Sequence, residues 1–190
     1  MARLFVVLIS SLLCGCALFG EALSISQRQA SEVPEGARIN GAGFTITAPD
    51  PGCYLKKDFP TEGGITLRPI ETLGQGMAYF VAPFAPDQAQ TTEEALEEWN
   101  LTPKRKGLPV KILESRKTSF QNRPATEAVV VVDSGNRTKT AAFLVVKGSL
   151  GYLVLSYSPP KFIEFDRQKS TAASKDGLRR LIQNTTITLD

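Results

Sequence analysis

The stretch that decides the fold is residues 109–158, "PVKILESRKTSFQNRPATEAVVVVDSGNRTKTAAFLVVKGSLGYLVLSYS". It divides into segments typical of strands, residues 109–120, 125–135, 138–148 and 151–158, which are separated by turn-forming residues. Because the connections "DSGNRT" and "KGSLG" are short, these segments are predicted to pair in sequence order as an antiparallel meander. The runs "AVVVV" and "AAFLVV" are apolar on both faces, which predicts central strands that are covered on both sides.

Shorter elements precede this meander. The segments "GFTITAP", "CYL", "GITLRPI" and "MAYFVAPF" are each bounded by Gly, Pro or Asp and favour strands. Thr91 and Glu94 form a capping-box pattern, which predicts a helix that begins at Thr91 and ends near Leu101, before Pro103. Trp99 falls on the apolar face of this helix and is expected in the core.

The C-terminal part is predicted to return to helix. Residues 161–186 are helical in part, with Gly177 as a weak point in the helix. The segment "TITL" then predicts a short edge strand near the C-terminus.

This order of elements resembles the PsbP-like superfamily, which includes the extrinsic PsbP subunit of photosystem II and DcrB-like envelope lipoproteins of bacteria. The stretches that carry the resemblance are "GFTITAPDPGCYLKK", "NRPATEAVVVV", "GYLVLSYSPPKFIEF" and "LRRLIQNTTI". The resemblance implies an α+β fold, an antiparallel β-sheet flanked by helices in an α/β/α sandwich, over residues 38–190. It also implies an accessory or regulatory subunit rather than an enzyme. Cys53 departs from the pattern, because the family often has Trp there.

The N-terminus reads as a secretory leader. One positive charge is followed by an apolar run of about 10 residues, roughly 15 Å as a helix, which is too short to cross about 30 Å of hydrocarbon. The run closes on Leu13-Cys14-Gly15-Cys16, which resembles the bacterial lipobox. The resemblance implies cleavage between Gly15 and Cys16, lipidation of Cys16 by acyl chains such as palmitate, and a membrane anchor.

The leader divides the chain into residues 1–15 as a signal peptide, 16–37 as a lipidated tether and 38–190 as one domain. Ala17 resembles the outer-membrane sorting signal, so a Gram-negative host would place the protein on the outer membrane, facing the periplasm. A Gram-positive host would place the anchor on the plasma membrane. A simple cleaved signal peptide, or metal or redox chemistry at the cysteine pair, are the alternatives.

Composition excludes several chemistries. The net charge of +3 argues against a nucleic-acid partner, and the absence of histidine removes imidazole catalysis and most zinc sites. We therefore expect no metal and no cofactor, and the resemblance to PsbP-like proteins implies no enzymatic activity. Cys53 has no partner cysteine in the lipidated chain and is predicted to be buried, with an intermolecular bridge or a reactive thiol as the alternatives. Ser158 and Lys161 formally match a Ser-x-x-Lys motif, but prolines fill the gap and predict a turn.

A group of basic residues is the best surface candidate for contact with anionic lipid head groups or an acidic partner. It consists of Lys104, Arg105, Lys106 and Lys111, with Arg116 and Lys117 further on, and the alternative is an ordinary solvated loop. The acidic residues between Glu93 and Glu98 are expected on a solvated helix face.

The sequence thus favours a non-catalytic, lipid-anchored accessory domain that docks on a protein complex of the cell envelope. A carrier for a small apolar ligand, which needs an internal cavity between sheet and helix, is the second hypothesis. A carboxylate-based hydrolase is the third.

Overall fold

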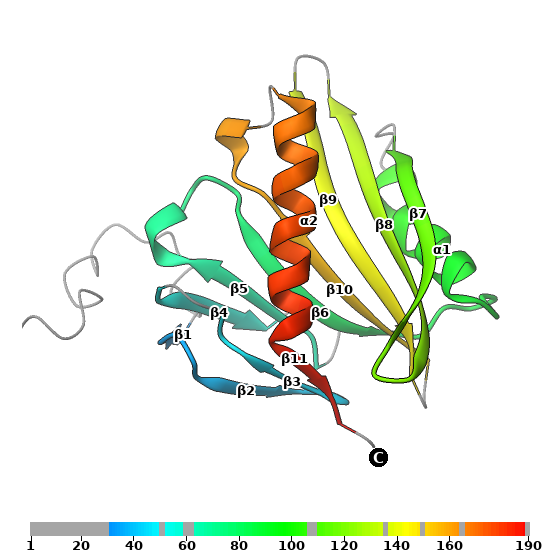
Figure 1. Ribbon diagram of the computed structural model, residues 1–190, viewed down its shortest axis with the longest axis horizontal. Coiled ribbons are helices and arrows are strands. Elements are labelled where there is room, and N and C mark those ends of the chain that lie inside the picture. The colour runs from blue at the N-terminus through cyan, green and yellow to red at the C-terminus, as the bar shows by residue number, and fades with distance from the viewer. Residues whose placement is uncertain are drawn as a thin grey trace, which may run out of the picture.

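A large antiparallel sheet forms the body of the protein in the computed structural model (Figure 1). The structure describes residues 31–49, 52–58, 63–105, 110–134, 137–148, 151–163 and 166–188. Within these ranges the sheet has eight strands in the order β1-β4-β5-β6-β10-β9-β8-β7. The strands are β1 (Ser31–Val33), β4 (Tyr54–Asp58), β5 (Ile65–Pro69), β6 (Ala78–Phe84), β10 (Tyr152–Ser158), β9 (Arg137–Lys147), β8 (Arg123–Ser134) and β7 (Val110–Phe120).

The predicted meander is confirmed, since β7, β8, β9 and β10 are consecutive neighbours in the sheet. The β7–β8 hairpin turns at Gln121 and Asn122, whose φ angles of 49° and 62° give the left-handed backbone that a two-residue hairpin turn uses. The Gln121 side-chain amide donates to the Thr185 carbonyl at 3.1 Å and accepts from the Ile187 N–H at 3.0 Å. This turn therefore also holds the C-terminal strand in place.

A second, smaller sheet has three strands in the order β11-β3-β2. It contains β2 (Arg38–Gly41), β3 (Phe44–Thr47) and β11 (Thr185–Ile187). The predicted C-terminal edge strand is confirmed, because β11 lies at one edge of this sheet. The fully buried Phe44 ring lies against Gly41, where a Cβ would come within 2.1 Å of it.

The helices α1 (Thr92–Arg105) and α2 (Arg167–Gln183) cover opposite faces of the large sheet (Figure 1). Successive residues of β9 show this, since Leu144 packs in the core that contains Leu181 of α2, whereas Val145 packs in the core that contains Leu96 of α1. The prediction of central strands covered on both sides is confirmed. No helix in the described ranges is long and apolar enough to cross a membrane.

The capping box of α1 is confirmed, because the Glu94 N–H donates to Thr91 Oγ1 and the Thr91 N–H donates to Glu94 Oε2, both at 3.2 Å. The predicted end near Leu101 is wrong, because α1 continues to Arg105. Pro103 lacks one N–H, so it removes one backbone hydrogen bond from the last turns without ending the helix.

Three other expectations change. Strand β1 pairs with β4, so Ser31–Val33 belongs to the sheet although residues 16–37 were expected as a tether. Cys53 is half-buried rather than buried, and it lies just before β4. Gly177 is not a weak point: it is buried against Tyr157 and lets α2 approach the sheet.

Candidate functional site

A groove of about 470 Å³ lies between α2 and the strands β7 and β8, on the face of the sheet that carries α2. Helix α2 packs mainly on β9 and β10, which leaves the outer strands uncovered beside it. The apolar part of the groove comes from Phe120, Val129, Leu144 and Ile182. The charged part comes from Glu114, Arg116, Glu127, Lys175 and Arg179.

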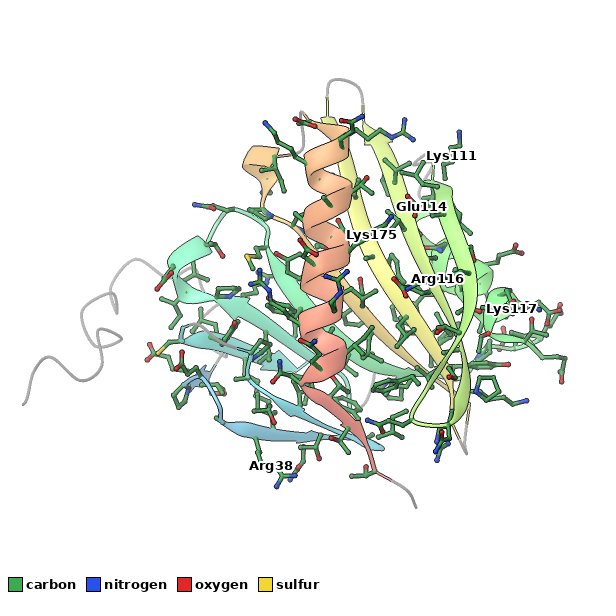
Figure 2. The ribbon with its side chains drawn as sticks, viewed as in Figure 1. Arg38, Lys111, Glu114, Arg116, Lys117 and Lys175 are labelled. Atoms are coloured by element: carbon green, nitrogen blue, oxygen red, sulfur yellow. The ribbon has the colours of Figure 1, made fainter. Side chains whose placement is uncertain are left out.

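A β-bulge in β7 decides which of its side chains face this groove. Ile112 pairs with Val130 and Glu114 pairs with Val129, so Leu113 is an extra residue opposite β8. Because side chains alternate along a strand, one extra residue moves all later side chains to the other face. The bulge therefore turns Glu114 and Arg116 toward α2 (Figure 2).

The side chain of Lys117 confirms this register from the opposite face. Its Nζ lies 3.1 Å from Glu93 Oε1 on α1, across the sheet from the groove. Without the bulge, Lys117 and Ser115 would face α2 in place of Arg116 and Glu114.

The charges in the groove form pairs between neighbouring elements. Lys175 Nζ of α2 donates to Glu114 Oε2 of β7 at 2.5 Å. Arg116 donates from Nε at 3.1 Å and from Nη2 at 2.6 Å to Glu127 Oε2 of β8. The hydrogen bonds and charge of Glu127 raise the pKa of Arg116, which stays protonated.

The carboxylates of Glu114 and Glu127 each accept a hydrogen bond from a cationic side chain. Among the described residues, no group of three or more acidic, cysteine or histidine side chains is placed to hold a metal ion. The arrangement is that of a polar groove with an apolar floor.

The predicted basic residues are only partly brought together. Lys104 and Arg105 lie in the last turn of α1 rather than in a loop, and Lys106 lies outside the described residues. Lys111 is exposed on β7, on the same face as Arg116 (Figure 2). Their proposed contact with lipid or partner stays a prediction.

Sequence reasoning missed Lys175 and Arg179 as members of this site, together with Glu114 and Glu127. The polar and charged stretch from Glu114 to Lys117 was a signal for an exposed strand. No sequence pattern marked which helix would lie beside it.

Hydrogen bonds between buried hydroxyl groups join α2 to β9. Thr140 Oγ1 lies 2.8 Å from Ser174 Oγ and also contacts Ser170 Oγ, while Ser174 Oγ donates to the Ser170 carbonyl at 2.8 Å. The three hydroxyls satisfy one another in the core, so their role is structural.

The turn predicted between Ser158 and Lys161 is also confirmed, because β10 ends at Ser158 and the 3-10 helix η2 (Lys161–Ile163) follows.

Trp99 packs against the core as predicted. Its ring stacks on Phe80 at a centroid distance of 5.4 Å and meets Phe84 edge-on at 5.1 Å. This aromatic cluster lies on the α1 face, away from the groove.

Two buried tyrosines under α2 are expected to lower the stability of the fold at alkaline pH. The rings of Tyr79 and Tyr157 lie 4.7 Å apart, and burial raises the pKa of both phenols, although Arg180 partly opposes this shift. Unfolded phenols titrate near 10, so above that pH the unfolded chain releases protons that the folded chain keeps, and stability falls.

Tyr157→Phe is expected to remove its share of this loss, up to about 1.4 kcal/mol for each pH unit above 10. Urea unfolding of both proteins at pH 7 and pH 11 measures the effect. An equal loss of stability in the variant and the parent protein would contradict the assignment.

Comparison with known proteins supports the fold. No protein-family model matches the chain, and no curated protein matches it. The solution structure of cyanobacterial PsbP (CyanoP) from Synechocystis aligns with a TM-score of 0.52 and 9% identity, covering 87% of this chain and 95% of that chain. The crystal structure of the Ran-binding protein Mog1p from Saccharomyces cerevisiae aligns with a TM-score of 0.56 and 15% identity, covering 83% and 95%.

The chain therefore has a PsbP-like α+β fold, in which helices pack on a mostly antiparallel sheet, as the sequence predicted. At these identities the likeness concerns the fold alone.

Proposed function

We propose that this chain is a lipid-anchored protein of the cell envelope whose domain binds a protein partner and catalyses no reaction. The observation that carries the proposal is the groove between α2 and β7, where ion-paired charges surround an apolar floor at the open edge of the sheet. Surfaces of this composition, with apolar contacts inside a polar rim, are typical of protein interfaces.

The structural neighbours support a protein partner. One of them, Mog1p, is a Ran-binding protein, so this fold can carry a protein-binding surface. The carboxylates of the groove are bound to cations and the chain has no histidine, which favours binding over catalysis.

The leader supports the anchor. Cys16 follows Leu13 and Gly15 in the lipobox pattern, and two or three acyl chains give effectively permanent membrane attachment. In a Gram-negative host, Ala17 favours the outer membrane, with the domain in the periplasm.

An apolar-ligand carrier is less well supported, because the groove is open and carries charged side chains on both of its walls. Ligand pockets for apolar molecules are mostly apolar and bury most of the ligand surface.

The test is a crosslinked pull-down of the tagged, full-length protein from the membranes of its own host, beside the variant Cys16→Ser. We expect a stoichiometric protein partner with the parent chain and a loss of about tenfold or more in the unanchored control, because anchoring raises the local concentration at the membrane. Recovery of the parent chain from membranes without any partner above an untagged control would contradict the proposal.

A further inference from the structure

We propose that the free edge of β7, from Glu114 to Phe120, accepts an extended acidic segment of the partner as an added strand beside the groove. This inference rests on the proposed function and specifies its surface and the chemistry of its partner. It uses strand addition, in which backbone hydrogen bonds provide affinity and alternate side chains provide specificity.

The first argument is the position of β7. It is the terminal strand of the large sheet and pairs with β8 alone among the described strands. It has 11 residues, whereas β1 at the opposite edge has 3. A terminal strand presents a row of N–H and C=O groups that can pair with another chain.

The bulge at Leu113 limits where such pairing can occur. Regular pairing runs without interruption from Glu114 to Phe120 on the β8 side, and the same regular backbone is presented at the outer edge. The bulge protects the start of the strand, from Val110 onward, against pairing. The usable edge therefore coincides with the part of β7 that lines the groove.

The second argument is the charge at this edge. The side chains of Arg116 and Lys117 are 72% and 85% exposed and lie on opposite faces of β7. Their acidic partners are set inward, with Glu127 at 23% and Glu93 at 33% exposure. Glu127 accepts hydrogen bonds from Nε and Nη2 of Arg116, and the Arg116 side chain remains exposed to solvent.

An added strand would place its side chains about 4.5–5.5 Å from those of β7, measured between Cβ atoms. Acidic side chains beside Arg116 and Lys117 are favourable on both faces, whereas basic side chains there are repelled. Lys175 of α2 lies on the opposite wall of the groove, where it pairs with Glu114 (Figure 2), and Arg179 of α2, which pairs with Asp176, also lines the groove. The partner segment is therefore acidic.

A second copy of this chain fits the edge poorly. Antiparallel pairing of the segment Glu114–Phe120 with the same segment of a second copy, centred on Lys117, would place the two Lys117 side chains directly opposite each other. Like charges directly opposite each other destabilise a sheet, so the occupant is a different chain.

The experiment uses the purified, lipidated full-length chain in detergent micelles and a blocked peptide of alternating Glu and Val as the probe. Hydrogen exchange reports backbone pairing, and fluorescence anisotropy reports affinity. We expect the peptide to slow exchange about tenfold or more at amides within Glu114–Phe120, and the same peptide with Lys in place of Glu to have no effect.

Charge reversal provides the matched comparison. The variants Arg116→Glu and Lys117→Glu each change a residue on a different face of β7. Each is expected to weaken peptide binding about tenfold, since it replaces an attraction to the acidic peptide with a repulsion. The control is Arg68→Glu, an exposed arginine on β5, which should change affinity less than about twofold. The edge pairs of exposed ions contribute little to stability, so the variants should fold.

Peptide binding without protection of β7 amides, equal binding of the Lys peptide, or no binding at all would overturn the inference. The pull-down separates this failure from that of the proposed function. A partner retained by Arg116→Glu and Lys117→Glu would leave the function standing on another surface, whereas absence of any partner from the parent chain would end the proposed function itself.

Discussion

Gly177→Ala is expected to destabilise the fold by roughly 1–3 kcal/mol, although alanine is the better helix former. A Cβ at residue 177 would lie 2.1 Å from Tyr157 Cδ1, well inside van der Waals contact. Tyr157 is 5% exposed and its ring packs on that of Tyr79, so the ring has little room to move. The helix α2 would have to lift from β10, which would disturb the core beneath it.

Urea unfolding and thermal melting measure this effect, with about 2–4 °C of melting temperature per kcal/mol for a protein of this size. The decisive comparison is the same substitution in a Tyr157→Ala background, where the ring is absent and Gly177→Ala should become neutral or stabilising. Ala172→Gly, at an exposed position of α2, measures helix propensity alone and should cost roughly 0.5–1 kcal/mol. Stabilisation by Gly177→Ala in the parent protein would contradict the packing described for α2.

Cys16→Ser is expected to release the protein from the membrane almost completely. Each buried methylene of an acyl chain contributes about 0.8 kcal/mol, so loss of two or three chains removes the anchor altogether. A serine oxygen cannot form the thioether that the lipobox resemblance implies for Cys16. Membrane fractionation and the intact mass of the mature chain measure both consequences.

The control for this prediction is Cys14→Ser, which changes the other cysteine of the pair and should leave anchoring intact. Loss of lipid from Cys14→Ser but not from Cys16→Ser would move the modification to Cys14. An unlipidated mature parent chain would instead support the simple cleaved signal peptide.

The large sheet could be predicted from sequence because its determinants are local. The runs at 128–132 and 141–146 are apolar on both faces, which predicted that both strands are buried. Short turns join the long strands, which predicted the order of the strands in the sheet. The capping box at Thr91 likewise acts within one helical turn. The helix end was predicted too early because Pro103 has a low helix propensity. The helix nevertheless continues through Pro103 to Arg105, since helix propensity is only a weak determinant of where a helix ends.

The second sheet and the groove could not be predicted because they depend on contacts between distant segments. Strand β11 meets β3 from the other end of the chain, and Gln121 reaches across to hold it. The bulge at Leu113 has no sequence signature, yet it determines that Arg116 rather than Lys117 faces α2. Lys104 and Arg105 looked like a basic loop because the helix was expected to end before them.

Native mass spectrometry tests most directly the claim that the chain docks on a protein partner. The complex is extracted from the membranes of its own host without crosslinking, through a tag on the full-length chain. The predicted result is one mass that equals the lipidated chain plus a protein partner in fixed stoichiometry. The chain alone, with a constant small increment from a bound apolar molecule, would contradict the docking function and favour the carrier.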